Sequence, residues 1–247
     1  MHRCFTYFAA ASAVCVGPAA RSADWYTGAV VPAERDAWIV AVDASTTLSS
    51  QGSQFAGATV TAAPQDSLLV SGPRVRLDGL IGSYRAEGGN GRNALGEQAE
   101  IAAMAGYAWV MPEAVLSGFV GLNVRRNELS QFDGSLPTDS VRVGLKTALD
   151  YYARPTAFTM LHATGTYSTA FGAYYGRVRA GVASVAGGFL GPEFAVLGDA
   201  YYRQWRAGIH LSGMQLGAVQ LGLSAGYLHD HARKGGAYTT LDLRTGF

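Results

Sequence analysis

The sequence predicts an all-β fold, namely an antiparallel transmembrane β-barrel of the outer-membrane type with about 12 strands, within a range of 10–12. Three observations support this prediction. Apolar and polar residues alternate along most of the chain, the alternating segments exceed the roughly 5–6 residues of an ordinary globular strand, and Phe247 ends the last of them. Apolar residues make up 49% of the 247 residues, yet no unbroken apolar run approaches the roughly 20 residues of a membrane-spanning helix. A helical membrane protein is therefore excluded.

The first 23 residues are typical of an export signal. Arg3 gives a short basic start, and an apolar stretch of small residues follows as far as Ala20. We expect residues 1–23 to be a signal peptide that is cleaved after Ala23, with cleavage after Ala20 as the alternative. Residues 24–247 would then form one barrel domain, exported to the periplasm and inserted into the cell outer membrane.

Cysteine usage and charge exclude several classes of protein. Both cysteines, Cys4 and Cys15, lie in the expected signal peptide, so the exported chain would contain none. A disulfide-stapled fold, a thiolate zinc site and cysteine catalysis are therefore not expected. The formal net charge is +1, and this balance gives no basic patch for a nucleic acid partner.

The segment 201–213 shows the alternation most clearly. Its odd positions, including Trp205 and Ile209, are mainly apolar, whereas its even positions, including Gln204 and Arg206, are polar or small. Successive side chains of a strand point to opposite faces, so one face would meet lipid and the other the barrel interior. The same pattern predicts strands over 36–48, 54–62, 73–86, 97–111, 114–128, 139–152, 157–169, 172–185, 189–198, 201–213, 216–229 and 236–247.

The pattern is weakest over 54–62 and 189–198. Within the second segment Pro192 lacks the N–H that a strand ladder needs. The connections predict tight turns on one rim and longer loops on the other, as in outer-membrane barrels. The expected tight turns are Pro112-Glu113, Arg154-Pro155-Thr156, Ala170-Phe171 and Met214-Gln215. The expected longer loops are 49–53, 62–72, 87–96, 129–138 and 230–235.

Aromatic residues gather near the ends of the predicted strands, which is where outer-membrane barrels carry two aromatic girdles. These residues are Trp38, Tyr107, Trp109, Phe171, Tyr174, Tyr201, Trp205, Tyr227 and Phe247.

The predicted interior face carries charges of both signs. Its cations are Arg76, Arg125, Arg142, Lys146, Arg177, Arg179, Arg206 and Arg244, and its acids are Asp78, Glu100, Asp150, Glu193 and Asp242. Because an isolated buried charge is costly, we expect these groups to pair or to contact water. They would form either a structural network, which we favour, or a substrate site. Glycines on the same face would leave room for bulky side chains opposite them.

Candidate chemistry is sparse. His229-Asp230-His231 is the one clustered metal-like motif, but it falls at a predicted loop and has no further assignable ligand. His162 with Ser168, and His210 with Ser212, share strand faces without forming a catalytic signature. We therefore expect no catalytic residue, no metal site and no cofactor.

Motifs in the C-terminal third are more specific than the architecture. The stretches 188–193 (GFLGPE), 202–210 (YRQWRAGIH) and 223–227 (LSAGY) resemble the cellulose biosynthesis protein BcsS family. Residues 100–109 and 118–121 are similar to the same family, as is Gly198-Asp199, and the resemblance spans roughly residues 36–247.

The resemblance implies a non-enzymatic outer-membrane barrel that is accessory to bacterial cellulose biosynthesis or secretion. Its expected partners are outer-membrane lipid, cellulose (a β-1,4-glucan) and cellulose synthase components. The alternatives are a small outer-membrane lipid-modifying enzyme and a generic porin unrelated to cellulose. The candidate lumen or glucan-contact residues are Tyr175, Arg177, Arg179, Glu193, Tyr202, Gln204, Arg206 and Tyr238.

Two carboxylates near the most family-like motif are spaced too widely for a glycosidase pair. Glu193 and Asp199 are six residues apart, which places them about 20 Å apart in one strand. Paired glycosidase carboxylates lie within about 5–9.5 Å of each other, so this pair is not expected to cleave glucan.

Overall fold

The computed structural model describes residues 39–64, 68–87, 93–130, 139–231 and 234–247. The expected signal peptide, residues 1–23, and the girdle candidate Trp38 lie outside the described residues.

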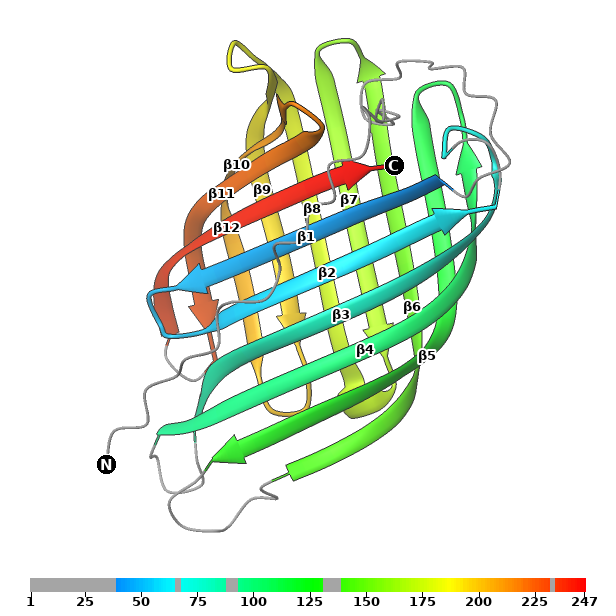
Figure 1. Cartoon of the computed structure of the whole chain (residues 1–247). Helices are drawn as coiled ribbons and strands as arrows, with labels where there is room; N and C mark the ends of the chain where they lie inside the picture. Colours follow the sequence, from blue (N-terminus) through cyan, green and yellow to red (C-terminus); the bar gives the residue numbers. More distant parts are fainter. Residues whose placement is uncertain (1–38, 65–67, 88–92, 131–138, 232–233) are drawn as a thin grey trace.

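The described chain forms a closed antiparallel barrel, in which each strand pairs with its neighbours in sequence and β1 pairs with β12 (Figure 1). The strands are β1 (Ile39–Ser49), β2 (Gln54–Ala63), β3 (Gly72–Glu87), β4 (Asn93–Val110), β5 (Ala114–Ser130), β6 (Asp139–Thr156), β7 (Thr159–Ser168), β8 (Ala173–Ser184), β9 (Gly188–Gly198), β10 (Arg203–Leu216), β11 (Val219–Asp230) and β12 (Lys234–Gly246). The short helix η1 (Ala170–Gly172) joins β7 to β8. The predicted fold class and the expected number of strands are confirmed.

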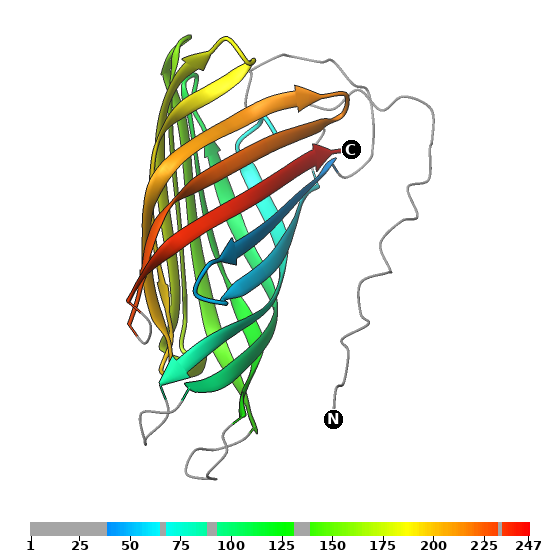
Figure 2. The same ribbon diagram turned by 90° about the vertical axis from the view of Figure 1, so that its left-hand side faces the viewer.

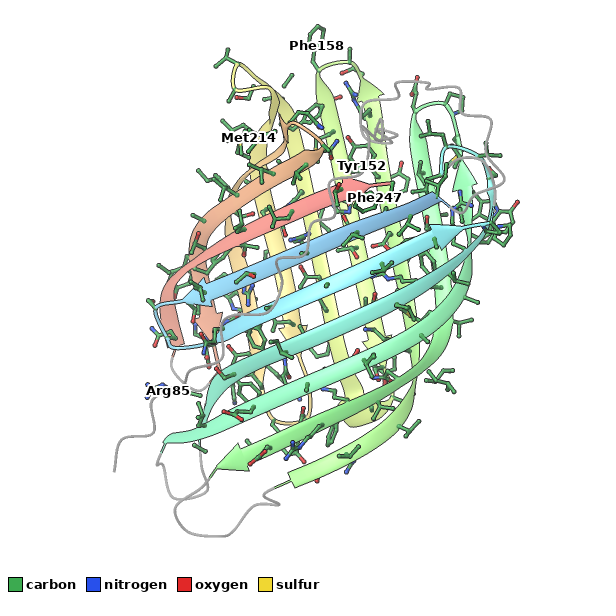
Figure 3. All side chains as sticks on the ribbon, viewed as in Figure 1. Arg85, Tyr152, Phe158, Met214 and Phe247 are labelled. Carbon is green, nitrogen blue, oxygen red and sulfur yellow. The ribbon has the colours of Figure 1, made fainter. Side chains whose placement is uncertain are left out.

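Alternation places the two faces of each strand as predicted. On β5, Asn123 and Arg125 are buried in the lumen, whereas Leu122 and Val124 between them are exposed on the outer wall. Side chains accordingly stand on both faces of the wall (Figure 3). No helix of the described residues is long and apolar enough to cross a membrane.

The barrel has two open ends, which we call the near rim, where the chain enters β1, and the far rim, where β1 ends. The near rim carries the start of β1, the end of β12 and the turns that follow β4, β6, β8 and β10. Phe158, in the turn between β6 and β7, and Phe247 lie at this rim (Figure 3). The far rim carries the hairpins that follow β1, β3, β5, β7, β9 and β11.

Strands β3 to β6 are longer than the others, with 16 to 18 residues each, so the wall extends further at the far rim on that side. Viewed from the side, β10, β11, β12 and β1 run obliquely across the barrel wall (Figure 2).

The predicted division of short turns and long loops between the rims was wrong in two places. The turn at Ala170-Phe171 lies on the far rim with the longer connections, and the connection over 62–72 lies on the near rim. Connection length depends on local packing as well as on the rim. Length alone therefore predicted the wrong rim for these two segments.

Two predicted turns are also displaced. β6 continues through Pro155 to Thr156, and the missing proline N–H is accommodated by an irregular register opposite β7. β10 continues past Met214 to Leu216, with a bulge opposite β11, and Gly217 makes the turn with a φ of 63°. A bulge adds a residue without ending a strand, so the hairpin closes later than predicted.

The two weakly patterned strands both form. β9 contains Pro192, which pairs with Ile209 of β10, while the ladder to β8 is interrupted between Glu193 and Leu190. The proline therefore sits where one of its two neighbouring ladders is broken.

A candidate lumenal binding site

A chain of ion pairs crosses the lumen from β3 to the far rim. Arg76 binds Asp150 and Asp78, the latter at 2.7 Å, and Lys146 lies 3.0 Å from Asp78 and 2.6 Å from Glu100. Arg125 continues the chain, with one amino group 3.1 Å from Glu100 and the other 2.7 Å from Asp199. Buried charges are thus neutralised by their neighbours, as the alternating pattern led us to expect.

A second network joins β8, β9, β11 and β12. Glu193 accepts hydrogen bonds from Arg179, from Ser224 at 2.9 Å and from Tyr238 at 3.0 Å. Arg179 also lies 2.6 Å from Asp242, and Arg177 lies 3.2 Å from the same carboxylate. Four of the eight candidate residues, namely Arg177, Arg179, Glu193 and Tyr238, meet here.

Aromatic and aliphatic side chains fill the lumen at the far rim. Tyr84, Ala94, Leu129 and Tyr202 form a buried cluster, which we call the far-rim cluster. The rings of Tyr84 and Tyr202 lie 4.6 Å apart.

Asp199 holds the connection between β9 and β10 in this position. It accepts the backbone N–H groups of Tyr201 and Tyr202, at 2.8 and 3.0 Å. Burial raises the pKa of the Tyr202 phenol, whose hydroxyl accepts a hydrogen bond from Gln204. The connection consequently turns into the lumen rather than away from the barrel.

Between the near rim and the far-rim cluster lies a cavity of about 420 Å³. Its walls combine aromatic rings, hydroxyl groups and charged groups. Tyr175, Arg177, Arg179 and Arg206 line it, whereas Glu193, Tyr202, Gln204 and Tyr238 lie outside its lining. The cavity is large enough for a small organic ligand.

Arg206 and Gln204 of β10 connect the cavity with Tyr202 of the far-rim cluster. Arg206 donates from Nε to Gln204 Oε1 at 2.6 Å, and Gln204 donates to the Tyr202 hydroxyl at 2.8 Å. The Arg206 guanidinium lies over the rings of Phe55 and Tyr238, at 5.9 and 5.6 Å from their centroids.

A family model described as cellulose biosynthesis protein BcsS matches residues 44–247. The chain belongs to the BcsS family. The resemblance seen in the sequence is therefore confirmed over most of the barrel. A comparison with curated proteins gave no match.

Several solved structures are similar in shape to this BcsS-family chain. A KdgM porin is 8% identical with a TM-score of 0.48, over 84% of this chain and 99% of the porin. The β domain of the Bordetella autotransporter BrkA is 16% identical with a TM-score of 0.46, over 84% and 98% of the two chains. The translocator domain of the autotransporter NalP from Neisseria meningitidis is 13% identical with a TM-score of 0.46, over 85% and 87%.

All eight candidate residues of this BcsS-family member lie on the lumen side. The structure brings them together as the second network and as the Tyr202–Gln204–Arg206 series, with Tyr175 on the cavity wall. Sequence reasoning missed Phe55 as a lumen residue, although the alternation over 54–62 puts it on the face that Thr59 shares.

Two girdle candidates were wrong. Phe171 is buried beneath the Arg142 guanidinium, 4.7 Å from the ring centroid, and its ring lies 5.9 Å from that of Tyr201. Tyr201 packs against the far-rim cluster. Both residues belong to connections that fold inward, and strand alternation does not predict the direction of a connection.

The fold separates the members of the His229-Asp230-His231 motif. His229 stacks on Trp205 at 5.7 Å on the outer wall, while Asp230 is buried. Among the described residues, no group of three or more His, Cys, Asp or Glu side chains is placed to hold a metal ion. His210 and Ser212 do make contact, with 3.0 Å between Nδ1 and Oγ, and His210 Nε2 lies 3.1 Å from the Ala180 carbonyl.

Proposed function

We propose that this chain is a non-enzymatic barrel of the bacterial outer membrane that assists cellulose biosynthesis or secretion. The observation that carries the proposal is the BcsS family match over residues 44–247, which supplies the association with cellulose. The location and the absence of catalysis are argued from the barrel itself.

The outer wall supports insertion into a membrane. It exposes many large apolar side chains, and the apolar surface they form is larger than soluble monomeric proteins tolerate in water. Exposed apolar side chains of this wall include Leu77, Ile81, Ile101, Leu122, Val143, Leu149, Val182, Ile209 and Leu223. Closure of the sheet satisfies the backbone hydrogen bonds, as a lipid environment requires.

Outward aromatic residues near both rims support the same location. Tyr107 and Trp109, 5.0 Å apart, lie toward the near rim, and Trp205 and Tyr227, 5.6 Å apart, lie toward the far rim. Such rings occupy the two lipid–water boundaries of outer-membrane barrels.

The lumenal carboxylates favour a non-enzymatic role. Each of the following acids lies within ion-pair distance of an arginine or lysine: Asp43, Asp78, Glu100, Asp150, Glu193, Asp199 and Asp242. A glycosidase needs one carboxylic acid that stays protonated and a second carboxylate close to it. The oxygens of these carboxylates already contact guanidinium or ammonium groups, so they are poorly placed to act as a general acid and a nucleophile on a glucan.

Deletion of the gene tests the proposed role. We expect the deletion strain to make less cellulose, or to release it at the wrong place, and wild-type complementation to restore it. The double variant Glu193→Gln, Asp199→Asn should restore it substantially, provided that heat-dependent migration on a gel shows that the variant folds. Unchanged cellulose in the deletion strain would remove the functional assignment.

One observation favours the alternative of an outer-membrane enzyme. The His210 imidazole contacts the Ser212 hydroxyl, as a base contacts its nucleophile, and Ser212 lines the cavity. Purified wild type and Ser212→Ala should therefore be incubated with ester substrates and with cello-oligosaccharides. Cleavage that Ser212→Ala or the double carboxylate variant abolishes would make the protein an enzyme; equal inactivity supports the proposal.

A further inference from the structure

Arg206 differs from the other arginines that line the lumenal cavity. Arg76, Arg177, Arg179 and Arg244 each pair with a carboxylate, and Arg74 donates to the backbone carbonyls of Leu68, Val70 and Pro73. Arg206 makes one side-chain hydrogen bond, from Nε to the neutral amide of Gln204. Within the described residues, its two Nη groups donate no hydrogen bond.

This cation is nevertheless buried. Arg206 is only 5% exposed, and it lines the cavity at the end next to the far-rim cluster. The rings of Phe55 and Tyr238 lie against its guanidinium and stabilise the charge by cation–π interaction. Such contacts are weaker than a carboxylate partner for a desolvated guanidinium.

The carboxylate that interacts electrostatically with Arg206 is already occupied. Glu193 interacts electrostatically with Arg206, but its oxygens accept from Arg179, Ser224 and Tyr238. Tyr238 therefore stands between the two charges, with its hydroxyl on Glu193 and its ring under Arg206. A buried cation without a carboxylate partner is costly, so the described residues leave the Arg206 site incomplete.

We propose that the cavity binds an anionic group, such as a phosphate, sulfate or carboxylate, at the free edge of the Arg206 guanidinium. The planar guanidinium suits such groups because its parallel N–H bonds match two of their oxygens. Tyr175 also lines the cavity and interacts electrostatically with Arg206 and Arg177, so we assign its hydroxyl to the same site as a further hydrogen-bond donor.

The other residues that line the cavity indicate which kind of molecule would carry the anionic group. Tyr175 offers an aromatic ring next to the hydroxyl of Thr166, its partner in the β7–β8 pairing, and both line the cavity. Aromatic faces with hydroxyl groups beside them suit a hydroxylated molecule such as an acidic sugar. A free anion would use the same guanidinium, so experiment must separate the two sources.

Calorimetric titration of the full barrel, refolded in a neutral detergent and an uncharged buffer, tests this site. The probes are inorganic phosphate, glucuronate and glucose. We expect both anions to bind and Arg206→Gln to weaken them at least tenfold, with Arg206→Lys retaining part of the affinity. Arg203→Gln removes the same charge from the exposed outer face of the same strand, and it should leave binding unchanged.

The remaining results decide the source and the proposal. Tighter binding of glucuronate than of phosphate assigns the site to an acidic sugar, and equal binding assigns it to the anion alone. If Arg206→Gln does not fold, Tyr175→Phe should still weaken both anions severalfold. No binding of either anion, glucose binding as tight as glucuronate, or binding that neither variant changes would overturn the proposal.

Discussion

Arg125 on β5 and Asp199, in the connection between β9 and β10, form an ion pair across the lumen with 2.7 Å between Nη2 and Oδ2. In the sheet β5 is not a neighbour of β9 or β10, so this contact ties separate parts of the wall together. Asp199 also receives two backbone N–H groups of the connection that carries Tyr202. The pair therefore fixes the residue that packs against Tyr84 in the far-rim cluster.

Removal of this ion pair should destabilise the barrel. We expect Arg125→Gln to lower the free energy of unfolding by about 3 kcal/mol, the lower end for breaking a buried pair, because Asn127 still donates to Asp199. Arg126 is the matched control, since it follows directly, faces outward and pairs with Glu128 on the exposed surface. Arg126→Gln should cost less than about 1 kcal/mol. Urea titration in lipid vesicles measures both variants, and equal losses would contradict a structural role for the Arg125 pair.

The far-rim cluster should also restrict passage through the barrel. Because the Tyr202 ring fills the lumen against Tyr84, we expect Tyr202→Ala to raise the single-channel conductance in planar bilayers above that of the wild type. Tyr227→Ala removes an aromatic ring of the same kind from the outer wall and should leave conductance unchanged. A wild-type barrel that conducts as well as Tyr202→Ala would show that the cluster does not limit passage.

Glycine opposite a bulky ring is a further constraint on the lumen. Gly96 of β4 pairs with Tyr84 of β3, and a Cβ at Gly96 would overlap the Tyr84 ring. We expect Gly96→Val to cost about 1–3 kcal/mol through overpacking. Gly79→Val is the control, because a Cβ there meets no atom within 4 Å. If the double variant Gly96→Val, Tyr84→Ala folds no better than Gly96→Val alone, the overlap is not the cause.

The sequence predicts well on which side of the barrel wall a side chain lies. It predicts poorly which contacts that side chain makes across the lumen. Alternation is a local property of a strand, so it correctly assigns Gln204 and Arg206 to the lumen and Trp205 to the outer wall. The pairing of Arg125 with Asp199 depends instead on the stagger of the closed barrel, which no local pattern encodes.

Connections are the other weakness of prediction from sequence. Phe171 and Tyr201 are aromatic, as residues at the lipid boundary often are, but their segments turn inward and make contacts within the protein. The predicted hairpin after β10 comes too early because the bulge between Leu211 and Met214 adds length to the strand. Among the described residues Arg206 bonds the Gln204 amide rather than a carboxylate, and this is not predictable either, because it depends on which acids the neighbouring strands supply.

The depth of the membrane can be tested with two leucines of similar exposure. Leu122 lies in the middle of β5 and is 63% exposed, whereas Leu216 ends β10 at the near rim and is 67% exposed. An arginine at the bilayer midplane costs roughly 2–4 kcal/mol, and the cost falls to about 0–1 kcal/mol near the interface. We therefore expect Leu122→Arg to make the free energy of folding into vesicles less favourable by roughly 2–4 kcal/mol. Leu216→Arg should fold nearly as well as the wild type. Because the two substitutions are chemically identical and start from equally exposed positions, their difference reports depth rather than side-chain type. Equal and small losses would indicate that the apolar wall faces water or another protein, and the proposed membrane location would then have to be abandoned.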